Sequence, residues 1–144
     1  MVYGSETWAM KVEDMRRLER AERMMVRWMC GVTLKERKHS EELLARLGIE
    51  GVAEIVRRGR LRWYGHVERL NARDSSKRDW VSACREITVE GSRGRGRGRK
   101  TWKECVEEDM KRLRLKKEEV HDRALWRRAI MGHRLTRASA ETQT

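Results

Sequence analysis

The sequence contains no proline, no phenylalanine and only three cysteines. Without phenylalanine a core must be built from Leu, Val, Met and Trp, and the eight Met and six Trp favour small, loosely packed helices. Cys30, Cys84 and Cys105 are odd in number and far apart, which argues against a disulfide framework and indicates a reducing compartment. These cysteines and the four histidines lack the short spacings of zinc ligands, so we expect no metal site.

Long apolar runs are missing as well. No run approaches the roughly 20 apolar residues that span a bilayer. The first residues also lack the cationic start and the apolar core of a signal peptide. We therefore expect a protein without a membrane partner, in an intracellular location that includes the nucleus.

Catalytic constellations are equally scarce. A two-metal polymerase or nuclease site needs clustered carboxylates, and the aspartates are scattered among cations. Lys100-Thr101 resembles the end of a phosphate-binding P-loop, but Arg99 stands where the loop needs glycine, and no convincing strand precedes it. No motif positions a cysteine beside a histidine. We predict that the chain is not an enzyme on its own and takes no cofactor; convergence of three acids in a pocket would revive the enzyme alternative.

Positive charge is what the sequence has in excess. Lys and Arg number 35 against 23 Asp and Glu, which gives a formal charge of +12, and arginine greatly outnumbers lysine. A guanidinium binds phosphate with a planar fork and stacks on bases, so this excess indicates nucleic acid as the partner more than a membrane surface.

Apolar residues recur at steps of three and four along most of the chain, which predicts an all-α protein of about five or six helices. Ser5 or Thr7 is expected to cap the first helix, and Gly31, Gly48 and Gly132 are expected to end helices. The expected helices run from about Trp8 to Met29, from Ser40 to Leu47, from Gly51 to Leu70, over Lys77 to Cys84, from the cap Thr101 to Leu113, and from Asp122 to Ile130.

The helices are predicted to form two small lobes joined by a flexible loop. The first lobe covers residues 1–72, and residues 73–100 hold a short helix and a Gly/Arg-rich loop. Residues 101–144 form the second lobe, with a disordered tail from Ala138.

The second long helix carries an arginine cluster with no acid between Glu54 and Glu68. The cluster predicts a fixed phosphate-binding surface, beside which Tyr64 is the better candidate for base stacking and Trp63 for the core. Gly59 and Gly65 are poor helix residues, and close approach of another helix or of a nucleic-acid backbone would explain them. The predicted surface consists of Arg57, Arg58, Arg60, Arg62 and Tyr64.

The stretch from Gly91 to Trp102, GSRGRGRGRKTW, alternates cations with glycine. The alternating glycines make its backbone too flexible to form a buried core. The stretch therefore predicts a mobile group of cations suited to an irregular polyanion. A solvated linker is the alternative. The predicted mobile binding residues are Arg93, Arg95, Arg97, Arg99 and Lys100.

Four motifs resemble the C-terminal region of non-LTR (LINE-type, RTE-like) retrotransposon reverse transcriptases. They are YGSETW at Tyr3–Trp8, RLRWYGHV at Arg60–Val67, GRGRKTW at Gly96–Trp102, and Asp122-Arg123 with Trp126-Arg127. The motifs occur in the same order as in the family and cover nearly the whole chain. The chain departs from the family at Gly98, where the family carries proline, and over Val32 to Glu42, where the family is more regularly basic.

The resemblance implies thumb-like helices and a downstream segment that holds template RNA and target DNA, with the polymerase portion as a further partner. The family's Asp-Asp polymerase motif has no counterpart in this sequence. We therefore expect a nucleic-acid-binding fragment of a reverse transcriptase without the polymerase active site. The alternatives are a helical protein-interaction module, whose sign would be an exposed stripe of Met24, Met25, Trp28 and Met29, or a non-functional retrotransposon relic.

Overall fold

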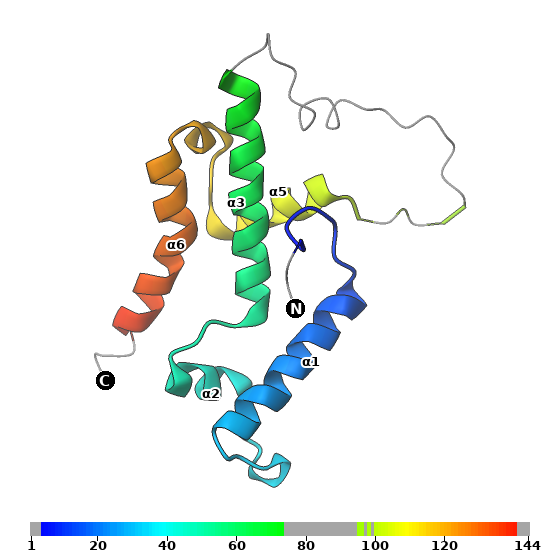
Figure 1. Cartoon of the computed structure of the whole chain (residues 1–144), viewed down its shortest axis with the longest axis vertical. Helices are drawn as coiled ribbons and strands as arrows, with labels where there is room; N and C mark the ends of the chain where they lie inside the picture. Colours follow the sequence, from blue (N-terminus) through cyan, green and yellow to red (C-terminus); the bar gives the residue numbers. More distant parts are fainter. Residues whose placement is uncertain (1–3, 74–94, 97, 99, 141–144) are drawn as a thin grey trace. The chain divides into compact units, whose positions relative to one another are not determined.

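A computed structural model of the chain describes residues 4–73, 95, 96, 98 and 100–140. These residues form five α-helices and two 3-10 turns, and they contain no strand, which confirms the all-α prediction (Figure 1). The predicted helix at Lys77 to Cys84 lies outside the described residues. In chain order the elements are α1 (Val12–Met29), η1 (Leu34–Glu36), α2 (Ser40–Leu47), α3 (Val52–Arg73), α5 (Trp102–Leu113), η2 (Lys117–His121) and α6 (Arg123–Ala140).

The chain divides into two compact units inside α3. Unit 1 covers Met1–Gly59 and unit 2 covers Arg60–Thr144. The predicted boundary of the first lobe lies instead at residue 72, one residue before the end of α3. The lobe arrangement and its Gly/Arg loop remain predictions.

In unit 1, α1 begins later than predicted. Thr7 donates from both its backbone N–H and its hydroxyl to the Gly4 carbonyl, at 3.2 and 3.0 Å. The Thr7 hydroxyl is therefore used in a turn, and the predicted start at Trp8 is wrong. The predicted end is confirmed, because Gly31 has φ +65° and its N–H donates to the Trp28 carbonyl.

The rotation of α1 within unit 1 is fixed by polar contacts on its inner side. The Glu22 carboxylate accepts a 2.6 Å hydrogen bond from the Val52 N–H at the start of α3. At its last turn, Arg27 donates to the Thr33 and Lys38 carbonyls, at 3.2 and 2.8 Å. Among the described residues of this unit, the buried apolar side chains are Val26, Leu43 and Val56.

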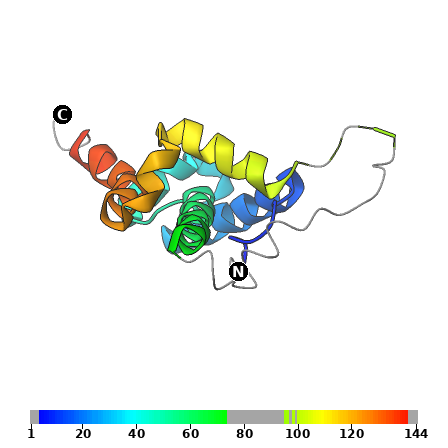
Figure 2. The ribbon, with the colours of Figure 1, turned by 90° about the horizontal axis from the view of Figure 1, so that it is seen from above.

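In unit 2, the second half of α3 packs with α5, η2 and α6 (Figures 1 and 2). Trp126 of α6 is 2% exposed, and its indole N–H donates to the Leu61 carbonyl at 3.1 Å. A Cβ added at Gly65 would lie 2.4 Å from the Trp126 ring nitrogen, so α6 requires glycine there. The predicted close approach of a helix is thereby confirmed for Gly65. The core consists of Leu61, Val106, Met110, Val120, Trp126 and Ile130.

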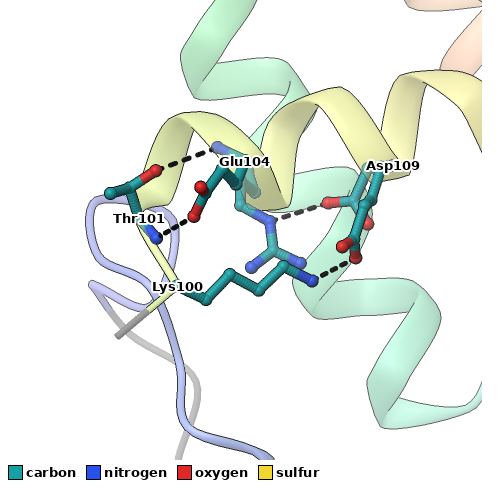
Figure 3. A network of polar contacts seen from close by, with 6 residues as sticks. Lys100, Thr101, Glu104 and Asp109 are labelled. Atoms are coloured by element: carbon teal, nitrogen blue, oxygen red, sulfur yellow. Dashed lines mark hydrogen bonds and ion pairs between the residues drawn. The ribbon is translucent and has the colours of Figure 1, made fainter. Parts of the chain in front are cut away.

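The start of α5 follows the predicted cap. Thr101 accepts a hydrogen bond from the Glu104 N–H, and Glu104 accepts one from the Thr101 N–H, which makes a reciprocal capping box (Figure 3). At α6, the Asp122 carboxylate accepts from the Ala124 and Leu125 N–H groups. The predicted end of this helix at Gly132 is wrong, since α6 continues to Ala140, which also shortens the predicted tail.

Candidate nucleic-acid interface

Three of the four arginines predicted to bind phosphate on α3 are held by carboxylates. In unit 1, Arg57 forms an ion pair with Glu54 one turn earlier, and Arg58 pairs with Glu50 at 2.5 Å. The Arg57 side chain is only 12% exposed. These carboxylates lie at or before the N-terminal edge of the acid-free stretch, within reach of its first arginines. Arg57 and Arg58 therefore contribute to the fold of unit 1 and offer little free charge to a phosphate.

Arg60 is the most deeply buried member of the predicted surface. Its Nε donates to the Asp109 carboxylate of α5 at 2.7 Å, and both side chains are about one-tenth exposed. Figure 3 shows Asp109 on α5, with a dashed line that marks this contact. A buried guanidinium paired with a carboxylate is satisfied inside the protein. Arg60 is thus part of the interior of unit 2 and does not belong to an open surface.

The remaining α3 residues of the prediction, Arg62 and Tyr64, differ from each other. Arg62 is exposed. Tyr64 is partly buried, and its ring centroid lies 6.2 Å from those of Trp102 and Trp126. Tyr64 therefore packs within an aromatic group on the core and is only partly accessible for base stacking. Trp63 is also partly buried, 5.5 Å from the His66 ring.

Two of the five predicted binding residues of the Gly/Arg loop lie in the described part of the chain. Arg95 is exposed. Lys100 is exposed as well and forms an ion pair with Glu108 of α5 (Figure 3). The predicted binding residues Arg93, Arg97 and Arg99 lie outside the described residues.

A group of cations that was not predicted to bind nucleic acid lies where α3 meets the start of α6. Arg69 is partly buried and donates to the Val120 carbonyl at 2.9 Å. Burial lowers the pKa of Arg69, and the nearby charge of Arg123 lowers this pKa further. Arg69 therefore lies near the charge of another cation, whereas Arg60 is paired with a carboxylate.

Two more arginines extend this group along α6. Arg123, Arg127 and Arg128 are exposed, and within the described residues none of them forms an ion pair or a hydrogen bond through its side chain. Together with Ala124 and Met131 they line a shallow hollow on the outer side of α6. No acidic residue occurs anywhere in α6. The positive field at this surface is thus not neutralised by its own helix.

On α3, Arg62 and Arg69 are seven residues apart, which places them on the same face of the helix. The resulting surface combines charge from two helices that are packed against each other through Trp126. Guanidinium groups without carboxylates suit phosphate, which they bind with paired N–H donors. We call Arg62, Arg69, Arg123, Arg127 and Arg128 the α3–α6 arginine surface.

The sequence did carry a signal for the α6 residues. The prediction for α3 rests on a run of arginines without acids, and residues 123–140 form a longer stretch without acids. Arg69 could not have been found in this way. Its environment depends on Val120 and Arg123, which are more than fifty residues away in the chain.

Other kinds of site find no support in the described part of the chain. No cluster of His, Cys, Asp and Glu there is suitable for holding a metal ion. Cys30 and Cys105 are free thiols, and Cys84 lies outside the described residues. Among the same residues, no helix has the length and hydropathy that a bilayer span requires. No family model, curated protein or solved structure matches the chain.

Proposed function

We propose that this chain binds the sugar-phosphate backbone of RNA or DNA with little dependence on base sequence. The α3–α6 arginine surface is the ordered part of the proposed site. Arg95, Lys100 and the other cations of the Gly/Arg loop supply further contacts. Lys100 takes part only when its ion pair with Glu108 opens, which costs little because the pair is exposed.

The observation that carries the proposal is that, within the described residues, none of these five arginines forms an ion pair with a carboxylate. Arg69 donates only to a carbonyl, and Arg123, Arg127 and Arg128 have no side-chain partner within the described residues. Bringing like charges together is unfavourable unless an anion joins them. A phosphate placed between Arg69 and Arg123 would relieve their repulsion and leave the protein's own ion pairs intact.

The expected mechanism is release of counterions from the nucleic acid. If about five arginines contact phosphates, the logarithm of the association constant should fall with the logarithm of salt concentration with a slope of roughly −3.5 to −4.5. Base identity should matter little, because contacts to phosphate and sugar carry no direct sequence information.

The test is a binding titration of the full chain against fluorescently labelled duplex DNA, duplex RNA, an RNA–DNA hybrid and single strands of mixed sequence. We expect binding at low salt, with the stated slope and with similar affinity for scrambled sequences of the same form. Absence of binding to every form at low salt, or an affinity that does not change with salt, would falsify the proposal.

The resemblance to non-LTR reverse transcriptases supports a more specific context. In that context the chain is a fragment that holds template or target nucleic acid for a polymerase portion and has no polymerase activity of its own. A basic surface on small helices fits such a role. An open reading frame with an Asp-Asp polymerase motif immediately upstream in the genome would support a functional fragment. A disrupted reading frame would support the alternative of a non-functional relic.

A further inference from the structure

The outer face of α1 in unit 1 is apolar and has no partner in the described structure. Met24, Met25 and Trp28 are 69%, 58% and 84% exposed, although they are among the largest apolar side chains of the unit. With Ala21 they occupy positions i, i+3, i+4 and i+7 of the helix, which places them on one continuous face. Such a stripe is the usual contact face between helices.

This face is turned outward by the contacts that fix α1 within unit 1. Glu22 is bonded to the start of α3, and Val26 is buried at 2% exposure on the opposite side of the helix. Arg27 is bonded to two carbonyls of the following loop. Rotating α1 to bury Trp28 would break these contacts, so unit 1 cannot cover the stripe with its own core.

The charges beside the stripe indicate what kind of helix fits there. Arg20 lies one turn before Met24, and Arg17 lies one turn before Ala21. Arg20 is exposed and forms no ion pair in the described part of the chain, and Arg17 has only an exposed 3.6 Å pair with Asp14. One edge of the apolar stripe therefore carries two exposed arginines, preceded by the exposed Glu13 one turn before Arg17.

A second copy of this chain is a poor match for this edge. In an antiparallel pair of α1 helices the arginine edges face each other, and in a parallel pair Arg17 lies opposite its own copy. Both arrangements place like charges together in a chain that already carries a net charge of +12. A helix with acidic residues along one edge avoids this repulsion and forms ion pairs with Arg17 and Arg20.

We propose that α1 docks an acidic amphipathic helix of another protein through Ala21, Met24, Met25 and Trp28, with Arg17 and Arg20 pairing to its acidic edge. The flexible thioethers of the two methionines can adjust to the partner's side chains. Trp28 is the expected anchor, because tryptophan is enriched among residues that dominate binding energy. This inference does not depend on nucleic-acid binding, which is assigned to unit 2.

The test uses the full chain and a synthetic helical peptide of three heptads, with leucine at its a and d positions and glutamate at its e and g positions. One control peptide carries lysine in place of every glutamate, and another has the acidic composition in scrambled order. At physiological salt we expect the acidic amphipathic peptide to bind and both controls to bind at least tenfold more weakly. Equal binding of the scrambled peptide would overturn the proposal, since charge alone would then explain the affinity.

Variants locate the site. Trp28→Ala should weaken binding of the acidic peptide about 30-fold, and circular dichroism should show unchanged helix content because the side chain is exposed. The matched control Leu125→Ala removes an apolar side chain that is 43% exposed on α6 and should leave the affinity unchanged. Arg17→Glu with Arg20→Glu should reverse the preference toward the lysine peptide.

Three results contradict the assignment. If the acidic peptide does not bind, or if Trp28→Ala binds it as well as the original chain does, the apolar face of α1 is not the proposed docking site. If sedimentation equilibrium shows a dimer that Trp28→Ala abolishes, the occupant is a second copy. The α6 substitutions Arg123→Ser, Arg127→Ser and Arg128→Ser should leave peptide binding intact. Peptide binding by α1 and nucleic-acid binding by unit 2 are therefore tested independently.

Discussion

Arg60 and Arg69 lie nine residues apart on α3, both within unit 2, and they have opposite surroundings. Arg60 is 8% exposed and bonded to the Asp109 carboxylate at 2.7 Å. Arg69 is bonded to a carbonyl and lies near the like charge of Arg123. The first guanidinium is paired with a carboxylate inside the protein, whereas the second has no carboxylate partner among the described residues. The partner of an arginine, more than the local density of arginines, decides whether it can bind phosphate.

The largest expected effect comes from breaking the ion pair between Arg60 and Asp109. Asp109→Ala leaves a buried guanidinium without its carboxylate, so the free energy of unfolding should fall by about 3 to 5 kcal/mol. Urea denaturation followed by circular dichroism measures this loss. In the double variant Arg60→Leu and Asp109→Leu both charges are gone, and stability should return close to the original value. A loss below about 1 kcal/mol for Asp109→Ala would show that Arg60 does not depend on Asp109 as its buried partner.

The two glycines of α3, Gly59 and Gly65, also have contrasting surroundings. Gly65→Ala drives a methyl group into the Trp126 ring and should cost about 1 to 3 kcal/mol of unfolding free energy. At Gly59 an added Cβ has its nearest neighbour at 3.9 Å, so Gly59→Ala should instead stabilise the protein by up to about 1 kcal/mol. Thermal denaturation of the two variants compares them directly. Stabilisation by both substitutions would contradict the packing of α6 on α3.

The Gly/Arg loop provides a smaller effect, on binding alone. Replacing Arg93, Arg95, Arg97 and Arg99 with serine should weaken nucleic-acid binding about fivefold, which corresponds to roughly 1 kcal/mol. The loss should be even across sequences, because phosphate contacts do not distinguish bases. Binding titrations and circular dichroism of the variant test both points. A loss of helix content would show that this stretch has a structural role and would contradict its assignment as a loop.

The smallest expected effect is on stability, when Arg123 near Arg69 is replaced. Arg123→Ser removes an exposed side chain without a partner in the described structure, and it also removes a like charge near Arg69. The free energy of unfolding should therefore change by no more than about 0.5 kcal/mol. Urea denaturation at low salt is the suitable measurement. A destabilisation above about 1 kcal/mol would mean that Arg123 is engaged inside the protein in the way that Arg60 is.

Local features of the fold were predictable because their causes are local. The capping box at Thr101 depends on a residue three positions away, and the ends of α1 and α2 follow from glycines at positive φ, Gly31 and Gly48. The start of α1 was not predictable, because Thr7 had two possible uses and the turn with Gly4 prevailed. Gly132 did not end α6, since glycine is tolerated inside helices at a modest cost.

The site was harder to predict because ion pairs join residues that are distant in the chain. Arg60 meets Asp109 across 49 positions, and periodicity contains no information about such a contact. The arginines of α6 were predictable in principle, from the absence of acids in residues 123–140. The exposed methionines and Trp28 of α1 were anticipated as the sign of an interaction module, and the structure places them on the outer face of that helix.

The most direct test of the central claim is the salt dependence of binding in two matched triple variants. Each variant loses three exposed arginines, either Arg123, Arg127 and Arg128 of α6 or Arg16, Arg20 and Arg23 of α1, with serine in their place. We expect the α6 variant to make the log-log salt slope for duplex RNA or DNA shallower by about 2 to 3, while the α1 variant keeps the slope of the original chain. Equal changes in the two variants would contradict the account, because net charge alone would then explain binding.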